Sequence, residues 1–304
     1  MNSLWLTLSI NGAYLALFLL PIGLVSLWRI KLANMRRSPL TKKLLRAPGE
    51  TLGNELEETR VDLLAKISVL TSLPILMFAT HISQSYFLGA KESLLRAAII
   101  LLMGGGAVIY LLWDMYKLGK RLTRLRQGYE GEVAIAQELN MLMRDGAYVY
   151  HDVPAEGFNI DHVIVSSKGV YAVETKSRMK PKRDLGAEDA KVIFDGRTLQ
   201  FPGWFESEPL EQAARQARWL ERWLTSAVGE KVGVKPVLAL PGWYVDRKGK
   251  SDVVIINGTN APTVFSKLFH AQLSEEMMKC IAHQLDQRCR DVEPAHFQKR
   301  DKIS

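Results

Sequence analysis

The chain has 304 residues and a formal net charge of +8, and 47% of its residues are hydrophobic. That length suffices for one soluble domain of ordinary size and a second region. The only cysteines, Cys280 and Cys289, form no metal or redox motif, and Walker, Rossmann, Ser-His-Asp and zinc patterns are absent, which excludes disulfide-built folds and the corresponding enzyme classes.

Three apolar segments in the first 116 residues predict membrane-spanning helices. Leu4–Trp28, Ile67–Ala90 and Ala97–Trp113 contain no charged residue. The first two reach the roughly 20 residues that a bilayer-spanning helix needs, and flanking side chains that snorkel can complete the third. We therefore predict a membrane region over residues 1–116, with helices at about 4–28, 67–90 and 95–115, and a basic juxtamembrane linker over residues 117–127.

Two alternatives to three spans stay open. A signal peptide would carry a basic start and a shorter apolar core than residues 4–28. Buried helices of a soluble protein would also be apolar. The glycines 104–106 offer a surface on which another helix could pack, which would allow homo-oligomers through the membrane helices, although a merely tolerated glycine run is the alternative.

Lysine and arginine in the short loops indicate the orientation. Seven basic residues lie between Arg29 and Arg46 and five between Lys117 and Arg126, whereas only Lys91 and Arg96 separate the second and third segments. We predict a multi-pass protein of the cytoplasmic (inner) membrane with its N-terminus outside and residues 117–304 inside. Because the positive charge is shared equally between residues 1–116 and 117–304, it serves the lipid bilayer as much as nucleic acid.

Residues 128–139 predict the start of a helix. Glu132, Ala136, Leu139 and Met143 fall on one stripe at helical spacing, so Glu132 should face inward. A first-turn glutamate is favoured by the helix dipole, but equally so on the exposed side. A carboxylate that faces inward needs a partner, and a metal ion is one.

Residues 159–165 and 170–176 predict two antiparallel strands joined by a turn at 166–169. A two-residue loop at 167–168 or a four-residue loop at 166–169 sets Asp161 opposite Glu174, and a loop at 168–169 sets it opposite Lys176. Side chains alternate between faces, so in either register Asp161, Glu174 and Lys176 share a face. His162 falls on the other face and is interpreted as a packing residue.

Two carboxylates and an ammonium that converge suit metal-dependent phosphodiester hydrolysis. Carboxylate oxygens hold Mg²⁺ or Mn²⁺, the ion polarises a phosphoryl oxygen and acidifies a water, and the ammonium offsets developing negative charge. The alternative is a surface hairpin with cross-strand ion pairs, because Glu-x-Lys is common in a chain with 24% charged residues.

Four motifs follow one another in the chain: Gly-x-x-Gly-Glu at 128–132, Ile-Asp-His at 160–162, Gly-Val-Tyr-Ala-Val-Glu-x-Lys at 169–176 and Pro-Leu-Glu-Gln at 209–212. Together they resemble the nuclease-related domain, NERD, which is similar to the PD-(D/E)-x-K restriction-endonuclease-like superfamily. The resemblance covers roughly residues 125–260. It departs from the superfamily at Ile160, which stands in place of proline and affects backbone shape more than ligand chemistry.

The resemblance implies a role for each matching residue. Asp161 and Glu174 would be metal ligands, Lys176 the catalytic lysine, and Glu132 a helix-borne acid that completes the metal site. Gln212 would be the helix glutamine near the site. A nuclease fold is implied more firmly than nuclease activity, because a fold does not fix a function.

Basic residues near this site are candidates for binding nucleic acid. The loop 177–183 could contact phosphates, or it could be an ordinary solvated loop. The helix after Pro209 carries an arginine stripe, but Glu211 and Glu221 make ion pairing within the helix an alternative. The candidates are Arg178, Lys180, Lys182, Arg183, Arg215, Arg218 and Arg222.

Strands and helices alternate through the rest of the chain. A hairpin turning at Asp195-Gly196, buried strands at 234–240 and 253–257, and helices at about 262–272 and 275–290 are expected. We predict a restriction-endonuclease-like mixed β-sheet flanked by helices over residues 128–275. Residues 276–304 would form a C-terminal helix and a polar tail.

Three functions are compatible with these features. The first is a membrane-anchored, divalent-metal-dependent nuclease that hydrolyses DNA at the cytoplasmic face. The second is a non-catalytic module of the same fold that binds nucleic acid or a protein at the membrane, and the third is an assembly protein built on its membrane helices. The presence of Glu132, Asp161, Glu174 and Lys176 together favours the nuclease, since a binding module has no need of acids facing a phosphate.

Overall fold

The computed structural model describes residue 16, residues 19–32, residue 40 and residues 42–87, 94–181 and 189–294. The chain divides into two compact units. The helical unit contains residues 1–42, 58–121 and 293–304, and the α/β unit contains residues 43–57 and 122–292. Helices α2 (Glu50–Phe87) and α3 (Leu94–Asn140) contribute residues to both units.

Two described helices are long and apolar enough to cross a membrane, namely Glu50–Ile82 and Ala97–Asp145. Length and composition alone are weak evidence, because a core helix of a soluble protein can pass the same test. Such a core helix would be mostly buried, however, and here Leu76 and Leu101 are 60% and 68% exposed. The helical unit therefore presents apolar side chains outward, as a membrane helix does.

Within the helical unit, α2 and α3 contact each other through a glycine and an ion pair. A Cβ built on Gly104 would lie 2.0 Å from the end of the Met77 side chain, so a larger residue there would require Met77 to move, whereas Gly105 and Gly106 face open space. Lys66 Nζ lies 2.6 Å from Asp114 Oδ2. The first of the three glycines is thus used for packing inside one chain.

The expected helix boundaries in this region need two corrections. Residues 117–127 are not a separate linker but part of α3, because leucine, lysine and arginine are good helix formers and the segment has no proline. Residues 128–139 do not start a helix; they lie in the last third of α3. The predicted span at 4–28 falls largely outside the described residues. Residues 19–32, which are described, are helical.

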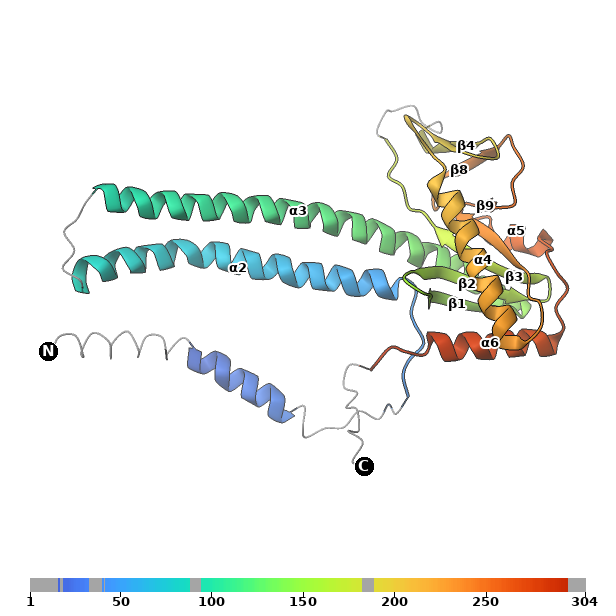
Figure 1. The fold of residues 1–304 in the computed structure, drawn as a ribbon, viewed down its shortest axis with the longest axis horizontal. Helices are drawn as coiled ribbons and strands as arrows, with labels where there is room; N and C mark the ends of the chain where they lie inside the picture. Colours follow the sequence, from blue (N-terminus) through green and yellow to red (C-terminus); the bar gives the residue numbers. More distant parts are fainter. Residues whose placement is uncertain are drawn as a thin grey trace. The chain divides into compact units, whose positions relative to one another are not determined.

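The α/β unit is built on a mixed sheet, as predicted (Figure 1). Its described strands follow the order β1-β2-β3-β7-β9. The first three pair antiparallel, and β7 and β9 continue the sheet parallel to β3. The bounds are β1 (Tyr148–Pro154), β2 (Asn159–Ser166), β3 (Gly169–Thr175), β7 (Val234–Ala239) and β9 (Val254–Ile256).

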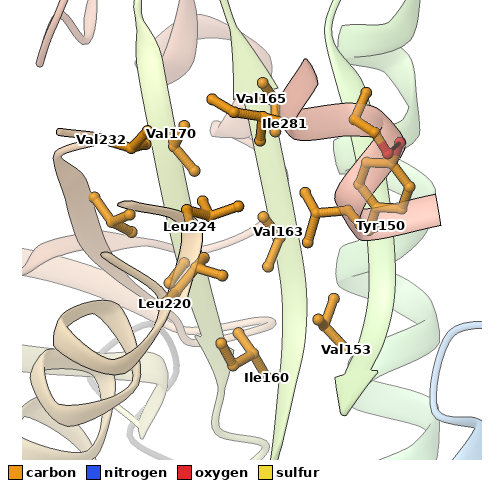
Figure 2. Close-up of a cluster of buried hydrophobic side chains, with 14 of the residues drawn as sticks. Tyr150, Val153, Ile160, Val163, Val165, Val170, Leu220, Leu224, Val232 and Ile281 are labelled. Atoms are coloured by element: carbon orange, nitrogen blue, oxygen red, sulfur yellow. Dashed lines mark hydrogen bonds between the residues drawn. The ribbon is translucent and has the colours of Figure 1, made fainter. Parts of the chain in front are cut away.

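Helices cover both faces of this sheet. On one face, α4 (Glu208–Val228) and α6 (Glu275–Cys289) pack on β1, β2 and β3. Figure 2 shows Val163 and Val170 of the strands meeting Leu220 and Leu224 of α4. On the other face, the end of α3 and the short helix α5 (Ala261–Lys267) bury a second cluster. The sheet is therefore buried on both sides, which explains why every residue of β3 is buried.

A smaller second sheet has the order β6-β5-β4-β8. Its strands are β4 (Lys191–Phe194), β5 (Leu199–Phe201), β6 (Trp204–Glu206) and β8 (Tyr244–Arg247). The hairpin expected at Asp195-Gly196 joins β4 to β5, and the Asp195 carboxylate accepts hydrogen bonds from the backbone N–H groups of Arg197 and Thr198. Strand β8 was not expected, and α5 ends at Lys267 rather than near residue 272.

Candidate functional site

The β2–β3 hairpin adopts the register that a two-residue loop predicts. Ser166 pairs with Gly169, and the ladder runs to the pair His162 and Val173. The ladder ends at this pair, and its register continued by one step would set Asp161 opposite Glu174. The Asp161 carboxylate turns toward β3 and accepts a hydrogen bond from the N–H of Thr175 at 2.6 Å.

Glu174 is the buried centre of the site, with only 2% of its surface exposed. Lys176 Nζ lies 2.7 Å from Glu174 Oε1. The amide nitrogen of Gln216, from α4, donates to Glu174 Oε2 at 2.5 Å and to the backbone oxygen of Asn159 at 3.3 Å. Each oxygen of this carboxylate is thus stabilised by a different element of the fold.

Glu132 reaches the same region from α3 and is 7% exposed. The predicted buried stripe is correct for Ala136 and Leu139 but wrong for Met143, which is 55% exposed, while Leu142 is buried. The reason is that α3 ends at Asn140 and the chain continues as a 3₁₀ helix, η1 (Met141–Asp145). A 3₁₀ helix turns about 120° per residue instead of about 100°, which moves the stripe to the neighbouring residue.

The pKa values of all three acids are raised. Burial raises the pKa of Glu132 to about 8, and the charges of Asp152 and Glu174 add to the effect, whereas Lys176 opposes it. Burial, then Glu174 and Glu132, raise the pKa of Asp161 well above its ordinary value. Burial also raises the pKa of Glu174, although Lys176 and Gln216 favour its charged form. One lysine does not balance two buried acids and a partly buried one, so further positive charge would be favourable here.

Three carboxylates of the site could contribute to the binding of a divalent cation. Among the residues that the structure describes, no three or more His, Cys, Asp or Glu side chains form a ready-made metal cluster. Nevertheless, Glu132, Asp161 and Glu174 offer the carboxylate oxygens that Mg²⁺ and Mn²⁺ prefer, and their raised pKa values indicate that a cation would be stabilised here. The bonds already made to Glu174 leave lone pairs free, because a carboxylate has about four acceptor positions.

The two glycines of the Gly-x-x-Gly-Glu motif let α3 approach the site closely. A Cβ on Gly131 would lie 2.7 Å from Cβ of Ser177, which follows Lys176. A Cβ on Gly128 would lie 3.1 Å from the side chain of Leu52. Glycine is unfavourable inside a helix, so its presence at these positions reflects the space available. The motif therefore positions Glu132 by letting the backbone of α3 lie against Ser177.

The glutamine expected at the site was assigned to the wrong turn of α4. Gln216, not Gln212, binds Glu174. Gln212 lies one turn earlier and is half-buried. The sequence carries a signal for the correct residue: Gln216 stands three residues after Ala213 and four before Leu220, both buried, so it lies on the buried stripe of the helix.

The candidate nucleic-acid-binding residues are in different environments. Arg178 is held by Glu206, with Nε and Nη2 each donating to its carboxylate, and Arg215 pairs with Glu208 and Glu211. Lys180 Nζ lies 6.0 Å from the centre of the Trp243 ring. Arg218 and Arg222 are exposed on α4, and Lys182 and Arg183 lie outside the described residues.

His162 is buried on the opposite face of β2, where the alternation of the strand places it. Its Nδ1 lies 2.9 Å from Nδ1 of His151, whose Nε2 lies 3.0 Å from Oδ1 of Asn140. Burial lowers the pKa of both histidines, that of His151 to about 4. The pair is therefore neutral near pH 7, which suits a packing role.

Comparison with known proteins gives one family. Residues 127–241 match the family model described as the nuclease-related domain, NERD. No curated protein and no solved structure matches the chain. The matched segment contains Glu132, Asp161, Glu174, Lys176 and Gln216.

We expect Gly131→Ala to destabilise the protein and to disturb the site, because the new Cβ would have to displace Ser177. The loss in free energy of unfolding should be about 1–3 kcal/mol, as for other overpacked positions. Thermal unfolding of the full chain in detergent measures it. Gly119→Ala in the same helix is the matched control, since a Cβ there meets nothing within 4 Å; it should be neutral or stabilising by up to about 1 kcal/mol. Equal effects of both changes would contradict the close contact at Gly131.

We expect Glu132→Gln to stabilise the metal-free protein at high pH. The native pKa of Glu132 is about 8 against an ordinary value of 4.5, so the folded state holds this proton more tightly than the unfolded state. Wild type must then lose stability as the pH rises from about 4.5 to about 8, and the glutamine variant avoids this loss. In chelator, the variant should be more stable on the order of 1–3 kcal/mol at pH 8.5 and close to wild type at pH 4.5.

The exposed Glu130, which pairs with Arg126, supplies the control for this measurement. Glu130→Gln should show no such pH dependence. If the difference in free energy of unfolding between Glu132→Gln and wild type stays constant from pH 4.5 to 8.5, the pKa of Glu132 is not raised.

Proposed function

We propose that the chain is a divalent-metal-dependent nuclease that hydrolyses phosphodiester bonds of DNA, because residues 127–241 match the nuclease-related domain. The observation that carries the proposal is that the Asp161 carboxylate binds the N–H of Thr175, next to Glu174 at the end of the same hairpin, and that Lys176 is bonded to Glu174. Glu132 adds a third carboxylate from a separate helix. Carboxylates beside an ammonium in a buried site are the groups that this reaction requires.

Each side chain has a role that follows from its contacts. Asp161, Glu174 and Glu132 would hold Mg²⁺ or Mn²⁺, which when bound polarises a phosphoryl oxygen and acidifies a water. Thr175 fixes Asp161 through its backbone N–H, and Gln216 fixes Glu174. Lys176 supplies an ammonium that stabilises the negative charge developing on the phosphoryl oxygens.

DNA would reach the site along the basic side chains that remain exposed. Arg218 and Arg222 are exposed on α4, the helix that also contributes Gln216. They can bind backbone phosphates without reading sequence. Arg178 already has an acidic partner and would instead support Glu206 and the second sheet.

The alternative is a non-catalytic module that binds nucleic acid or a protein. A surface made to bind phosphate gains nothing from three acids, which repel it, and the burial of Glu132 and Glu174 costs free energy. The raised pKa values of Glu132, Asp161 and Glu174 therefore favour catalysis over binding alone.

We expect Asp161→Ala, Glu174→Ala and Lys176→Ala each to reduce cleavage of DNA by the full chain more than about a hundredfold in Mg²⁺ or Mn²⁺. Metal ligation and charge stabilisation contribute several kcal/mol each to the transition state, and about 1.4 kcal/mol is a factor of ten. Rates of nicking and degradation under saturating DNA measure the effect. Lys231→Ala, which removes an exposed lysine, is the control and should keep wild-type activity.

Two results would favour the binding module. One is a wild-type protein that cleaves neither DNA nor RNA with any divalent metal. The other is cleavage by the three variants at the wild-type rate. In addition, Arg218→Ala with Arg222→Ala should weaken DNA binding and lessen its salt dependence while the cleavage rate of bound DNA persists.

We further propose that the protein is a multi-pass protein of the cytoplasmic membrane, with the α/β unit in the cytoplasm. Residues 43–57 and 122–292 belong to one compact unit, so the chain between them must cross a bilayer an even number of times. Two candidate helices lie in this interval. The basic residues flanking them favour the cytoplasm for the α/β unit, and a helix over residues 4–28 would place the N-terminus outside.

Reporters inserted after residues 2, 45, 92 and 130 would test this topology. We expect a reporter that is active only outside the cytoplasm to work after residues 2 and 92 and to be silent after 45 and 130, because basic loops are retained inside. Activity of that reporter after residue 130 would contradict the topology.

A further inference from the structure

The segment that precedes α2 is part of the α/β unit and is held there by Arg46. The guanidinium of Arg46 donates from Nε and Nη2 to the two carboxylate oxygens of Asp291, both at 2.8 Å. Its Nη1 donates to Oδ2 of Asp152 at 2.9 Å. Leu44 and Val292 also exchange backbone hydrogen bonds. Arg46 thus joins the end of α6 to the end of β1 through a bidentate pair, the strongest geometry for such an ion pair.

Asp152 is the centre of this network and is 3% exposed. Its Oδ2 also accepts hydrogen bonds from the N–H and the hydroxyl of Thr51, in the first turn of α2, and its Oδ1 accepts one from Nδ2 of Asn159. A carboxylate at a helix N-terminus is favoured by the helix dipole. With φ at 48°, Asp152 has a left-handed backbone that non-glycine residues seldom adopt. The contacts of its carboxylate compensate for that cost.

This unusual backbone interrupts the β1–β2 ladder at the site. The pairing passes from His151 with His162 directly to Val153 with Ile160, so Asp152 and Asp161 are opposite each other but do not pair in the ladder. Asp161 therefore lies at a local break in β2, where its carboxylate can turn to the N–H of Thr175. The conformation of Asp152 and the position of Asp161 depend on the same break.

Hydrogen bonds continue from this network to Glu174. Asn159 donates its amide to Asp152 and to Thr51, and its backbone oxygen accepts from Gln216, which also donates to Glu174. The connection runs from Asp291 through Arg46, Asp152, Asn159 and Gln216 to Glu174. Gly49 also lies beside Glu132, since an added Cβ there would be 3.5 Å from Oε2 of Glu132. Residues 43–57 are therefore connected to Glu174 by hydrogen bonds and adjoin Glu132.

We propose that Arg46 and Asp152 are positioning residues of the acidic site and that residues 43–57, which include the first turns of α2, are a required part of it, although they lie outside the matched residues 127–241. The effect on catalysis rests on the proposed nuclease function, but the effect on the geometry of Asp161 and Glu174 does not. If residues 43–57 only anchored the chain, the contacts of Arg46 with Asp291 and of Leu44 with Val292 would be sufficient. The further bonds to Asp152 and through Asn159 lead to the site.

Hydrogen–deuterium exchange of the full chain in detergent tests the geometric part. Arg46→Ala removes the link, and Thr51→Val removes one hydroxyl from Asp152 while keeping the shape of the side chain. Both should raise amide exchange about tenfold or more in residues 159–161 and 174–176, because opening there becomes easier, and leave residues 163–173 unchanged. Arg290→Ala is the matched control, since the exposed Arg290 donates to the backbone oxygen of Lys43 and not to Asp152 or Asn159.

Kinetics of the same variants test the catalytic part. Displacing catalytic groups by about 1 Å can cost up to a hundredfold in rate, so kcat should fall about ten- to a hundredfold with KM unchanged. If Arg46→Ala does not fold, Thr51→Val decides. If the variants exchange faster at residues 159–161 and 174–176 but the wild-type chain cleaves no nucleic acid, the positioning role stands and the proposed nuclease function is refuted. Faster exchange confined to residues 43–57 and 289–292, or wild-type exchange and kcat in both variants, would overturn the positioning role.

Discussion

The burial of Glu174 is the constraint on which the site depends. A carboxylate with 2% exposure is unstable unless its charge or its hydrogen-bonding capacity is satisfied. Lys176 lies two residues further along the same chain segment and supplies the charge, whereas Gln216 of α4 supplies a hydrogen bond. Strand β3 can therefore end in an acid inside the fold because a helix from another part of the sequence has been placed beside it.

The same arrangement is the basis on which a cation is proposed for the site. Glu132 is buried and Asp161 partly buried, and burial together with the charge of Glu174 raises the pKa of both. If protein groups paired with all three carboxylates, a metal ion would gain little by binding there. If none of the carboxylates had a partner, the fold would be destabilised. The structure lies between these limits, since one ammonium is shared among three acids. This balance is typical of sites that bind a metal ion together with an anionic substrate.

Positioning comes from elements that are distant in sequence. Gly131 lets α3 contact Ser177 just after β3, and Asn159 joins the start of β2 to both Gln216 and Asp152. Arg46 extends this network to the segment before α2 and to the end of α6. A break in the ladder at Asp152 and Asp161 leaves the Asp161 carboxylate free to turn to Thr175. Local strain is thus concentrated at the point where the chemistry is proposed, and surrounding hydrogen bonds hold it.

The sequence alone determined the hairpin, its register and the face shared by Asp161, Glu174 and Lys176, because strand alternation and a two-residue turn are local properties. It also determined Glu132 as an inward acid and the mixed sheet. It divided α3 into two helices and chose Gln212 instead of Gln216, since helix ends and helix rotation depend on what packs against them. Only the tertiary structure revealed the Arg46 and Asp152 network, because its members are separated by more than a hundred residues and no local periodicity connects them. Contacts of that kind are decided by how the elements pack, and a pattern along the chain cannot encode them by itself.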